Sequence, residues 1–153
     1  MSKTATSPDG SSPSDTPTFR LRERLRVRWA EADLQGIVFN GHYLTYFDIA
    51  VTEYWRAIGR PFPAALEGTG VDLFAVKSTV EYLAPARYDD MIEVGCRAAR
   101  LGRSSITFEM AIWRDGQQIT RGELVYVCAD PVLRRATPIP EDLRRAIEAW
   151  ESK

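Results

Sequence analysis

The segment GHYLTYFDIAVTEYWRAI, residues 41–58, constrains the fold of this 153-residue chain more than any other stretch. It contains no proline and no period-two alternation, and its apolar side chains cover most of a helical circumference. The polar residues form one narrow stripe, which consists of Thr45, Asp48, Thr52 and Arg56. A helix that is apolar nearly all round is a buried helix. We therefore expect a long central helix that ends before Gly59 and Pro61 and needs a sheet to wrap it.

Five segments alternate between apolar and polar residues, which is the period of a β-strand. They are residues 19–29, 74–87, 91–101, 104–113 and 117–130. In the second segment we expect one apolar face, made of Phe74, Val76, Val80 and Tyr82. Four successive strands with short links favour antiparallel pairing, and Asp115-Gly116 indicates a hairpin turn.

The last periodic segment, residues 140–150, predicts a short capping helix, with Pro140 in its first turn and an apolar stripe of Leu143, Ile147 and Trp150. The prediction is an α+β fold in which an antiparallel sheet of five or more strands wraps one long central helix. We expect residues 18–153 to form a single domain. Residues 1–17 have almost nothing to bury, and we expect them to be a disordered tail.

Composition excludes several classes of function. The net charge of -1 gives no general attraction to nucleic acid. The chain has one histidine and two cysteines without a Cys-x-x-Cys pair, so we expect no metal site. No apolar run approaches the roughly 18 residues of a membrane span, and the first residues lack the apolar core of a secretory signal. We therefore expect a cytoplasmic protein.

Arginine occupies every even position from 20 to 28 in the first predicted strand. Such a row could be a phosphate-binding face or simply the solvated face of a strand, and we favour the second interpretation.

Asp33 lies in the sequence ADLQGIVFNGHY, residues 32–43, between the first strand and the central helix. The first turn of a helix has unpaired N–H groups and a positive dipole end, which would polarise a carbonyl group and stabilise an oxyanion. A carboxylate nearby could attack that carbonyl or deprotonate a water. The alternative is an ordinary turn aspartate followed by a glycine.

The same residues resemble the signature of the hotdog-fold acyl-CoA thioesterases, in the 4-hydroxybenzoyl-CoA thioesterase-like branch. The matching positions are Asp33, Gly36, Val38, Phe39 and Tyr43. A second match is TVEYLAPARYDD, residues 79–90, and a weaker one is Arg103 with Ser105. The likeness runs from about residue 19 to residue 136.

This resemblance implies hydrolysis of an acyl-CoA thioester without a cofactor, with Asp33 as nucleophile or general base. It implies backbone N–H donors at Asn40 and Gly41, and homodimers that pair into tetramers, with the active site where two subunits meet. Many relatives carry histidine at the position of Asn40, and asparagine cannot titrate. Possible substrate or CoA contacts are Tyr43, Arg87, Arg103 and Ser105.

Other polar residues are alternative candidates. Asp48 and Glu53 on the central helix are the next choices for the catalytic carboxylate, because another hotdog branch uses a helix carboxylate. We expect His42 to be a partly exposed residue of the first helical turn, and Tyr46, Tyr54 and Trp55 to belong to the core. Alternative functions are a non-catalytic acyl-binding hotdog protein, or a hotdog dehydratase that acts on carrier-bound acyl chains through Asp33 and His42.

Overall fold

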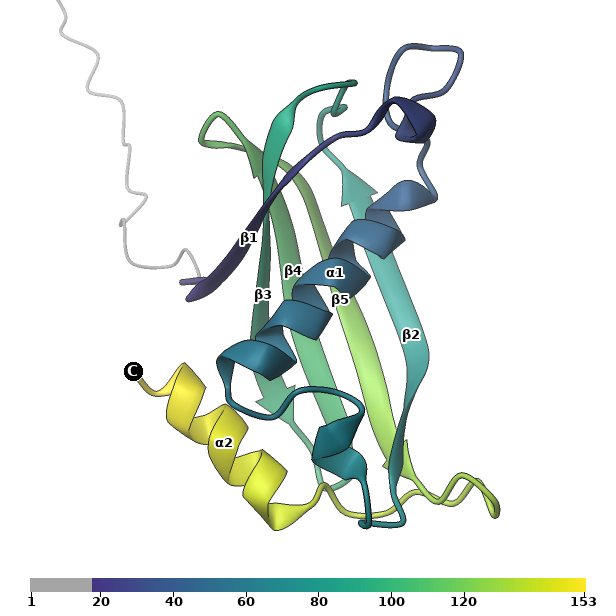
Figure 1. Ribbon diagram of the computed structural model, residues 1–153, viewed down its shortest axis with the longest axis vertical. Coiled ribbons are helices and arrows are strands. Elements are labelled where there is room, and N and C mark those ends of the chain that lie inside the picture. The colour runs from purple at the N-terminus through teal and green to yellow at the C-terminus, as the bar shows by residue number, and fades with distance from the viewer. Residues whose placement is uncertain (1–17) are drawn as a thin grey trace, which may run out of the picture.

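A long helix lies across one face of a five-stranded antiparallel sheet in the computed structural model, which describes residues 18–153 (Figure 1). The predicted tail, residues 1–17, lies outside the described residues. The sheet has the order β1-β3-β4-β5-β2. Its elements are β1 (Leu21–Arg26), α1 (His42–Ala57), β2 (Asp72–Tyr82), β3 (Met91–Leu101), β4 (Ser105–Arg114), β5 (Gln117–Ala129) and α2 (Glu141–Glu151), with short 3-10 turns η1 (Trp29–Glu31) and η2 (Ala64–Leu66). The predicted α+β hotdog arrangement is confirmed.

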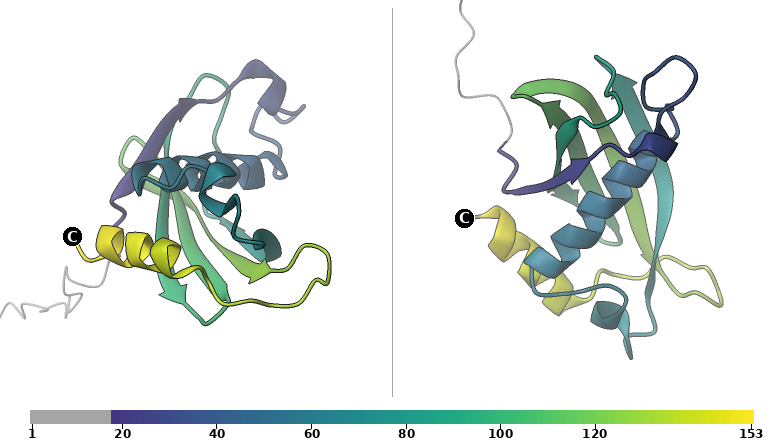
Figure 2. Two further views of the ribbon diagram at one scale, coloured as in Figure 1. Left: turned by 60° about the horizontal axis from the view of Figure 1, so that its bottom comes forward. Right: turned by 45° about the horizontal axis from the view of Figure 1, so that its top comes forward.

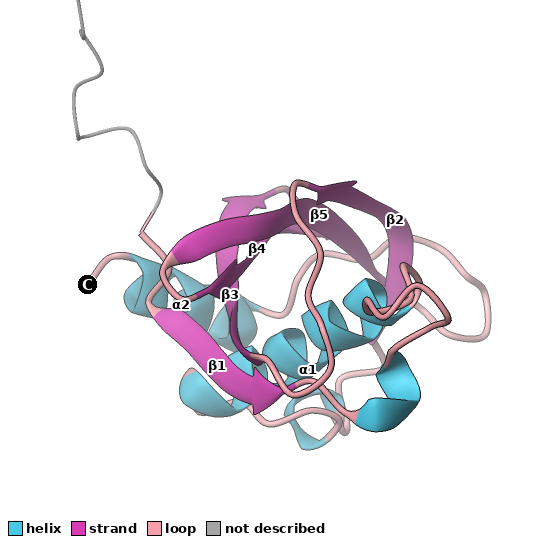
Figure 3. Cartoon of the chain, turned by 90° about the horizontal axis from the view of Figure 1, so that it is seen from above, coloured by secondary structure: helices cyan, strands magenta, loops and turns pink. Residues whose placement is uncertain are grey.

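The sheet curves around α1, as the view from above shows (Figure 3). The apolar circumference of α1 explains this curvature, because a flat sheet would cover only one side of the helix. The buried residues of α1 are Tyr43, Tyr46, Phe47, Ala50, Val51, Tyr54 and Trp55. They pack on alternate residues of β3 and β4, such as Ile92, Val94, Phe108 and Met110. Each such side chain contributes about 1.5–3 kcal/mol by its burial.

The arginine row of β1 is mostly engaged by the chain itself. Arg20 donates to the backbone oxygen of Trp150 (3.1 Å) and lies over its indole ring, 3.9 Å from the ring centroid. Arg22 lies over the Trp113 ring, and Arg26 donates to the backbone oxygen of Asp89 (2.8 Å). These contacts favour the interpretation of a solvated strand face with local partners.

Strand β2 departs from the predicted alternation. The pairing of β2 with β5 shifts register between Ala75 and Lys77, so Val76 forms a β-bulge. Val80 packs on the core after the bulge, whereas Phe74 and Val76 do not. The single apolar face predicted for this strand is therefore wrong, because one extra residue reverses the faces of all that follow.

Helix α2 packs beside the far end of α1 (Figure 2). Leu143 and Ile147 are buried, as the stripe predicts, and Pro140 is the N-cap just before the first turn. Glu151 links α2 to α1 and β3, because its Oε1 accepts hydrogen bonds from the Tyr54 hydroxyl and from the Ala98 backbone N–H, both at 2.8 Å. No helix among residues 18–153 is long and apolar enough to cross a membrane.

Candidate active site

The loop between η1 and α1 presents Asp33. The Asp33 N–H donates to the Ile37 oxygen (2.9 Å), and the Gly36 N–H donates to the Asp33 oxygen (3.0 Å). Gly36 has a φ of 78°, a left-handed conformation that glycine adopts without strain. Oδ1 of Asp33 accepts from the Gln35 N–H (2.8 Å), whereas Oδ2 accepts no hydrogen bond within residues 18–153. One carboxylate oxygen is thus held by the turn and the other is available to a ligand.

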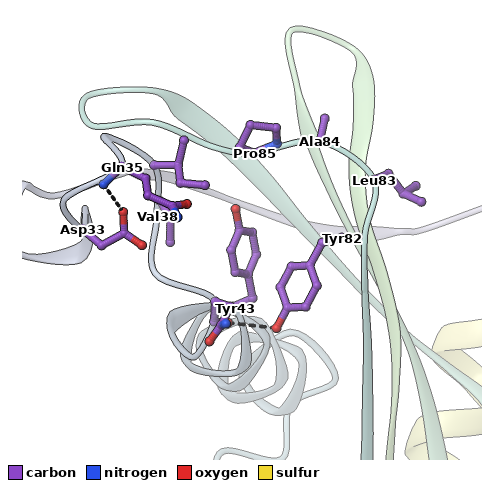
Figure 4. Close-up of a pocket in the computed structure, with 10 residues that line it drawn as sticks. Asp33, Gln35, Val38, Tyr43, Tyr82, Leu83, Ala84 and Pro85 are labelled. Carbon is purple, nitrogen blue, oxygen red and sulfur yellow. Dashed lines mark hydrogen bonds between the residues drawn. The ribbon is translucent and has the colours of Figure 1, made fainter.

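A cavity of about 330 Å³ lies beside this carboxylate (Figure 4). Its walls come from the loop, from the first turn of α1, and from the connection between β2 and β3. The lining residues are Asp33, Gln35, Ile37, Val38, Asn40, Tyr43, Tyr82, Leu83, Ala84 and Pro85. The apolar wall and the few polar groups are typical of a small-molecule site.

The N-terminus of α1 opens beside the loop that carries Asp33. Within residues 18–153, neither the Asn40 N–H nor the Gly41 N–H donates a hydrogen bond. The Tyr82 hydroxyl donates to the Asn40 oxygen (3.1 Å), which fixes the peptide unit between Asn40 and Gly41. In a trans peptide the N–H points opposite to the C=O, so this bond also orients the Gly41 N–H. Asn40 lines the cavity, and Gly41, the next residue in the chain, is the N-cap of α1.

Tyr43 places a second polar group in the cavity. Its side chain is buried, and its oxygen accepts from the Ala86 N–H (3.1 Å). Burial raises the pKa of the Tyr43 phenol above its usual value, so the hydroxyl stays protonated at neutral pH. Within residues 18–153 the Tyr43 hydroxyl donates no hydrogen bond, so its proton is available to a ligand.

Several predicted residues lie away from this cavity. Arg103 lies in the turn between β3 and β4 and Ser105 is the first residue of β4; this turn is at the opposite end of the sheet from the loop that carries Asp33 (Figure 1). Asp48 is exposed on α1, and Glu53 forms an ion pair with Arg56. Neither these carboxylates nor His42, which is half-buried at the start of α1, lines the cavity. Arg87 lies nearer, because its backbone pairs with Ile37 in an isolated β-bridge.

Two residues near the site were not predicted from the sequence. Tyr82 lies in the matched segment 79–90, so its aromatic side chain beside the motif was an available signal. Glu31 lies two residues before Asp33 and is buried, which no pattern in the sequence indicates. Within residues 18–153, no group of three or more His, Cys, Asp or Glu side chains is placed to hold a metal ion.

A five-stranded antiparallel sheet wrapped around one long helix is the architecture of the hotdog-fold class. The thioesterase superfamily matches residues 35–121, which is more than half of the chain. The chain therefore belongs to this family and is a thioesterase.

Named relatives and solved structures agree with this assignment. The acyl-CoA thioester hydrolase YbgC of Escherichia coli O157:H7 is 29% identical over 127 residues, which cover 82% of this chain and 94% of the relative. A thioesterase from Thermus thermophilus, solved with coenzyme A and zinc, is 32% identical with a TM-score of 0.76 and covers 88% of this chain and 96% of its own. A structure from Pseudomonas aeruginosa is 33% identical with a TM-score of 0.75 and covers 86% of this chain and 91% of its own.

Proposed function

We propose that the protein hydrolyses an acyl-CoA thioester to the free acid and CoA, with Asp33 as the reactive carboxylate. The main support for the proposal is the Asp33 carboxylate, which lines the cavity and has one oxygen without a hydrogen bond from residues 18–153. The first turn of α1 lines the same cavity. A relative named for acyl-CoA thioester hydrolysis and a structural neighbour that holds coenzyme A support this substrate class.

Two routes use the same groups. Asp33 can attack the thioester carbon directly, which expels the CoA thiolate and leaves an acyl anhydride for water to hydrolyse. Alternatively, Asp33 takes a proton from water, and the resulting hydroxide attacks the same carbon, which breaks the C–S bond, expels the CoA thiolate and leaves the free acid. In both routes negative charge develops on the carbonyl oxygen, and the N–H groups of Asn40 and Gly41 at the positive end of α1 stabilise it. The Asn40 side chain can donate a further hydrogen bond but cannot exchange a proton.

We further propose that the active protein is a homodimer joined along β2, with dimers pairing into tetramers. Strand β2 is an edge of the sheet, and Val76, Tyr82 and Leu83 on and beside it are 60%, 53% and 50% exposed. An exposed apolar edge strand favours pairing with another strand. Antiparallel pairing of two β2 strands would bring the turn between β3 and β4 of the second chain, with its copies of Arg103 and Ser105, to the end of the sheet where Asp33 lies.

The test is thiol release from a panel of aryl and aliphatic acyl-CoA substrates, with sedimentation of the same preparation. We expect turnover by a dimer or tetramer. Binding of acyl-CoA without release of thiol would instead indicate an acyl-binding protein, and turnover by a stable monomer would refute the shared site.

A further inference from the structure

Glu31 is a buried carboxylate next to the site. Only three polar or charged residues within the described range are buried, and Glu31 is the only one of them that carries a charge, at 9% exposure. Its Oε1 accepts two hydrogen bonds, from the Arg28 backbone N–H (2.7 Å) and from the Tyr46 hydroxyl (3.0 Å). A buried carboxylate is unfavourable unless it is bonded in this way, so the position calls for a reason.

The backbone around Glu31 closes the loop that carries Asp33. The Glu31 oxygen accepts from the Phe39 N–H (2.9 Å), and Ala32 forms a β-bridge with Val38. Glu31 therefore sits at the base of the loop, where its two ends meet. Its side chain bonds to Tyr46, which is fully buried one helical turn into α1. This bond joins the base of the Asp33 loop to the helix whose first turn lines the same cavity.

We propose that Glu31 and Tyr46 form a positioning pair, which sets the Asp33 carboxylate relative to the N-terminus of α1. The inference rests on the proposed function and adds two residues to it. Neither residue lines the cavity, so the pair acts through Asp33 and does not touch the substrate. Burial raises the pKa of the Tyr46 phenol far above its usual value, so the hydroxyl remains a donor throughout the working pH range.

The chain contains a matched control at the other end of α1. Tyr54 is also fully buried, and its hydroxyl donates to Oε1 of Glu151, which accepts one backbone N–H as well. Both pairs therefore contain a tyrosine of α1, a glutamate and one backbone donor, and Glu31 has in addition an ion pair between its Oε2 and the Arg28 guanidinium (3.7 Å). Only the Glu31 pair is attached to the loop of Asp33.

The experiment compares Tyr46→Phe with Tyr54→Phe for kcat, KM and Tm. Each change removes one buried hydroxyl, so we expect similar losses of Tm. We expect Tyr46→Phe to lower kcat about 10-fold with KM within twofold, because misplacing a reacting group reduces the rate without removing binding contacts. Tyr54→Phe should keep kcat within twofold of the wild type.

Glu31→Gln and Glu31→Ala complete the test. Glutamine keeps an oxygen acceptor for both donors, so Glu31→Gln should retain more of the wild-type kcat than Glu31→Ala. Equal losses of kcat in Tyr46→Phe and Tyr54→Phe, or an unchanged kcat in Tyr46→Phe, would overturn the positioning role. Asp33→Asn in the same series separates the two proposals, since full activity of that variant would refute the catalytic role of Asp33 itself.

Discussion

Replacing Asp33 by asparagine removes the negative charge and almost nothing else. The side-chain oxygen of the new asparagine can still accept from the Gln35 N–H, which is the one hydrogen bond of the Asp33 carboxylate. The loss of stability is then the difference between a charged and a neutral acceptor, about 1 kcal/mol. For a chain of this size that corresponds to a fall in Tm of about 2–4 °C.

The expected effect on turnover is much larger. Nucleophilic attack and base catalysis both need the charge, so kcat should fall by a factor on the order of 10² or more. That factor corresponds to about 2.7 kcal/mol of transition-state stabilisation. Some activity should remain, because the N–H groups at the start of α1 still polarise the carbonyl.

Asp130→Asn is the matched control for this change. Oδ1 of Asp130 also accepts from the N–H two residues ahead, that of Val132 at 2.8 Å, and in addition from the Leu133 N–H at 2.7 Å, in a turn that does not line the cavity of the same chain. Thiol release and Tm should be measured on both variants. Unimpaired kcat in a folded Asp33→Asn oligomer would refute the reasoning and direct attention to Asp48 and Glu53.

Three further predictions follow from particular contacts. Tyr82→Phe removes the donor to the Asn40 oxygen and should lower kcat several-fold with little change in KM, as steady-state kinetics would show; an unchanged kcat would mean that the Gly41 N–H needs no such support. Burial raises the pKa of the Cys128 thiol to about 11 and that of Cys96 well above its usual value, so neither should react with Ellman's reagent at pH 8 until the protein is unfolded. Val76→Arg places a charge on the exposed edge of β2 and should give a monomer with little activity; sedimentation of an intact, active dimer would exclude this edge as the interface.

Most of the fold could be predicted from periodicity alone. The all-round apolar pattern of residues 41–58 and the alternation of the strands reflect burial, which acts on every residue of an element and leaves a repeated signal. The bulge at Val76 left no such signal, because a single extra residue is a local event. The turn at Asp115 and Gly116 could be predicted from the sequence, because an Asp-Gly pair tolerates the positive φ that both residues adopt there.

The site was predictable only in part. Asp33, Asn40 and Tyr43 are close in sequence, so a local motif placed them together, and they do line one cavity. Glu31 and Tyr46 are bonded across 15 residues, and Tyr82 reaches Asn40 across 42, which depends on packing that spacing does not reveal. The disordered tail, the cytoplasmic location and the absence of cofactors stay predictions.

The two edges of the sheet have different consequences for assembly. Strand β2 exposes the apolar side chains of Val76 and Tyr82 along its edge, whereas β1 carries a row of arginines on one face. Two β1 strands side by side would set these rows directly against each other, and like charges on neighbouring strands are destabilising. We therefore expect growth by strand addition only at the β2 edge. The proposed dimer would have β1 at both outer ends, so we expect the sheet to end at two copies and not to continue into a fibre.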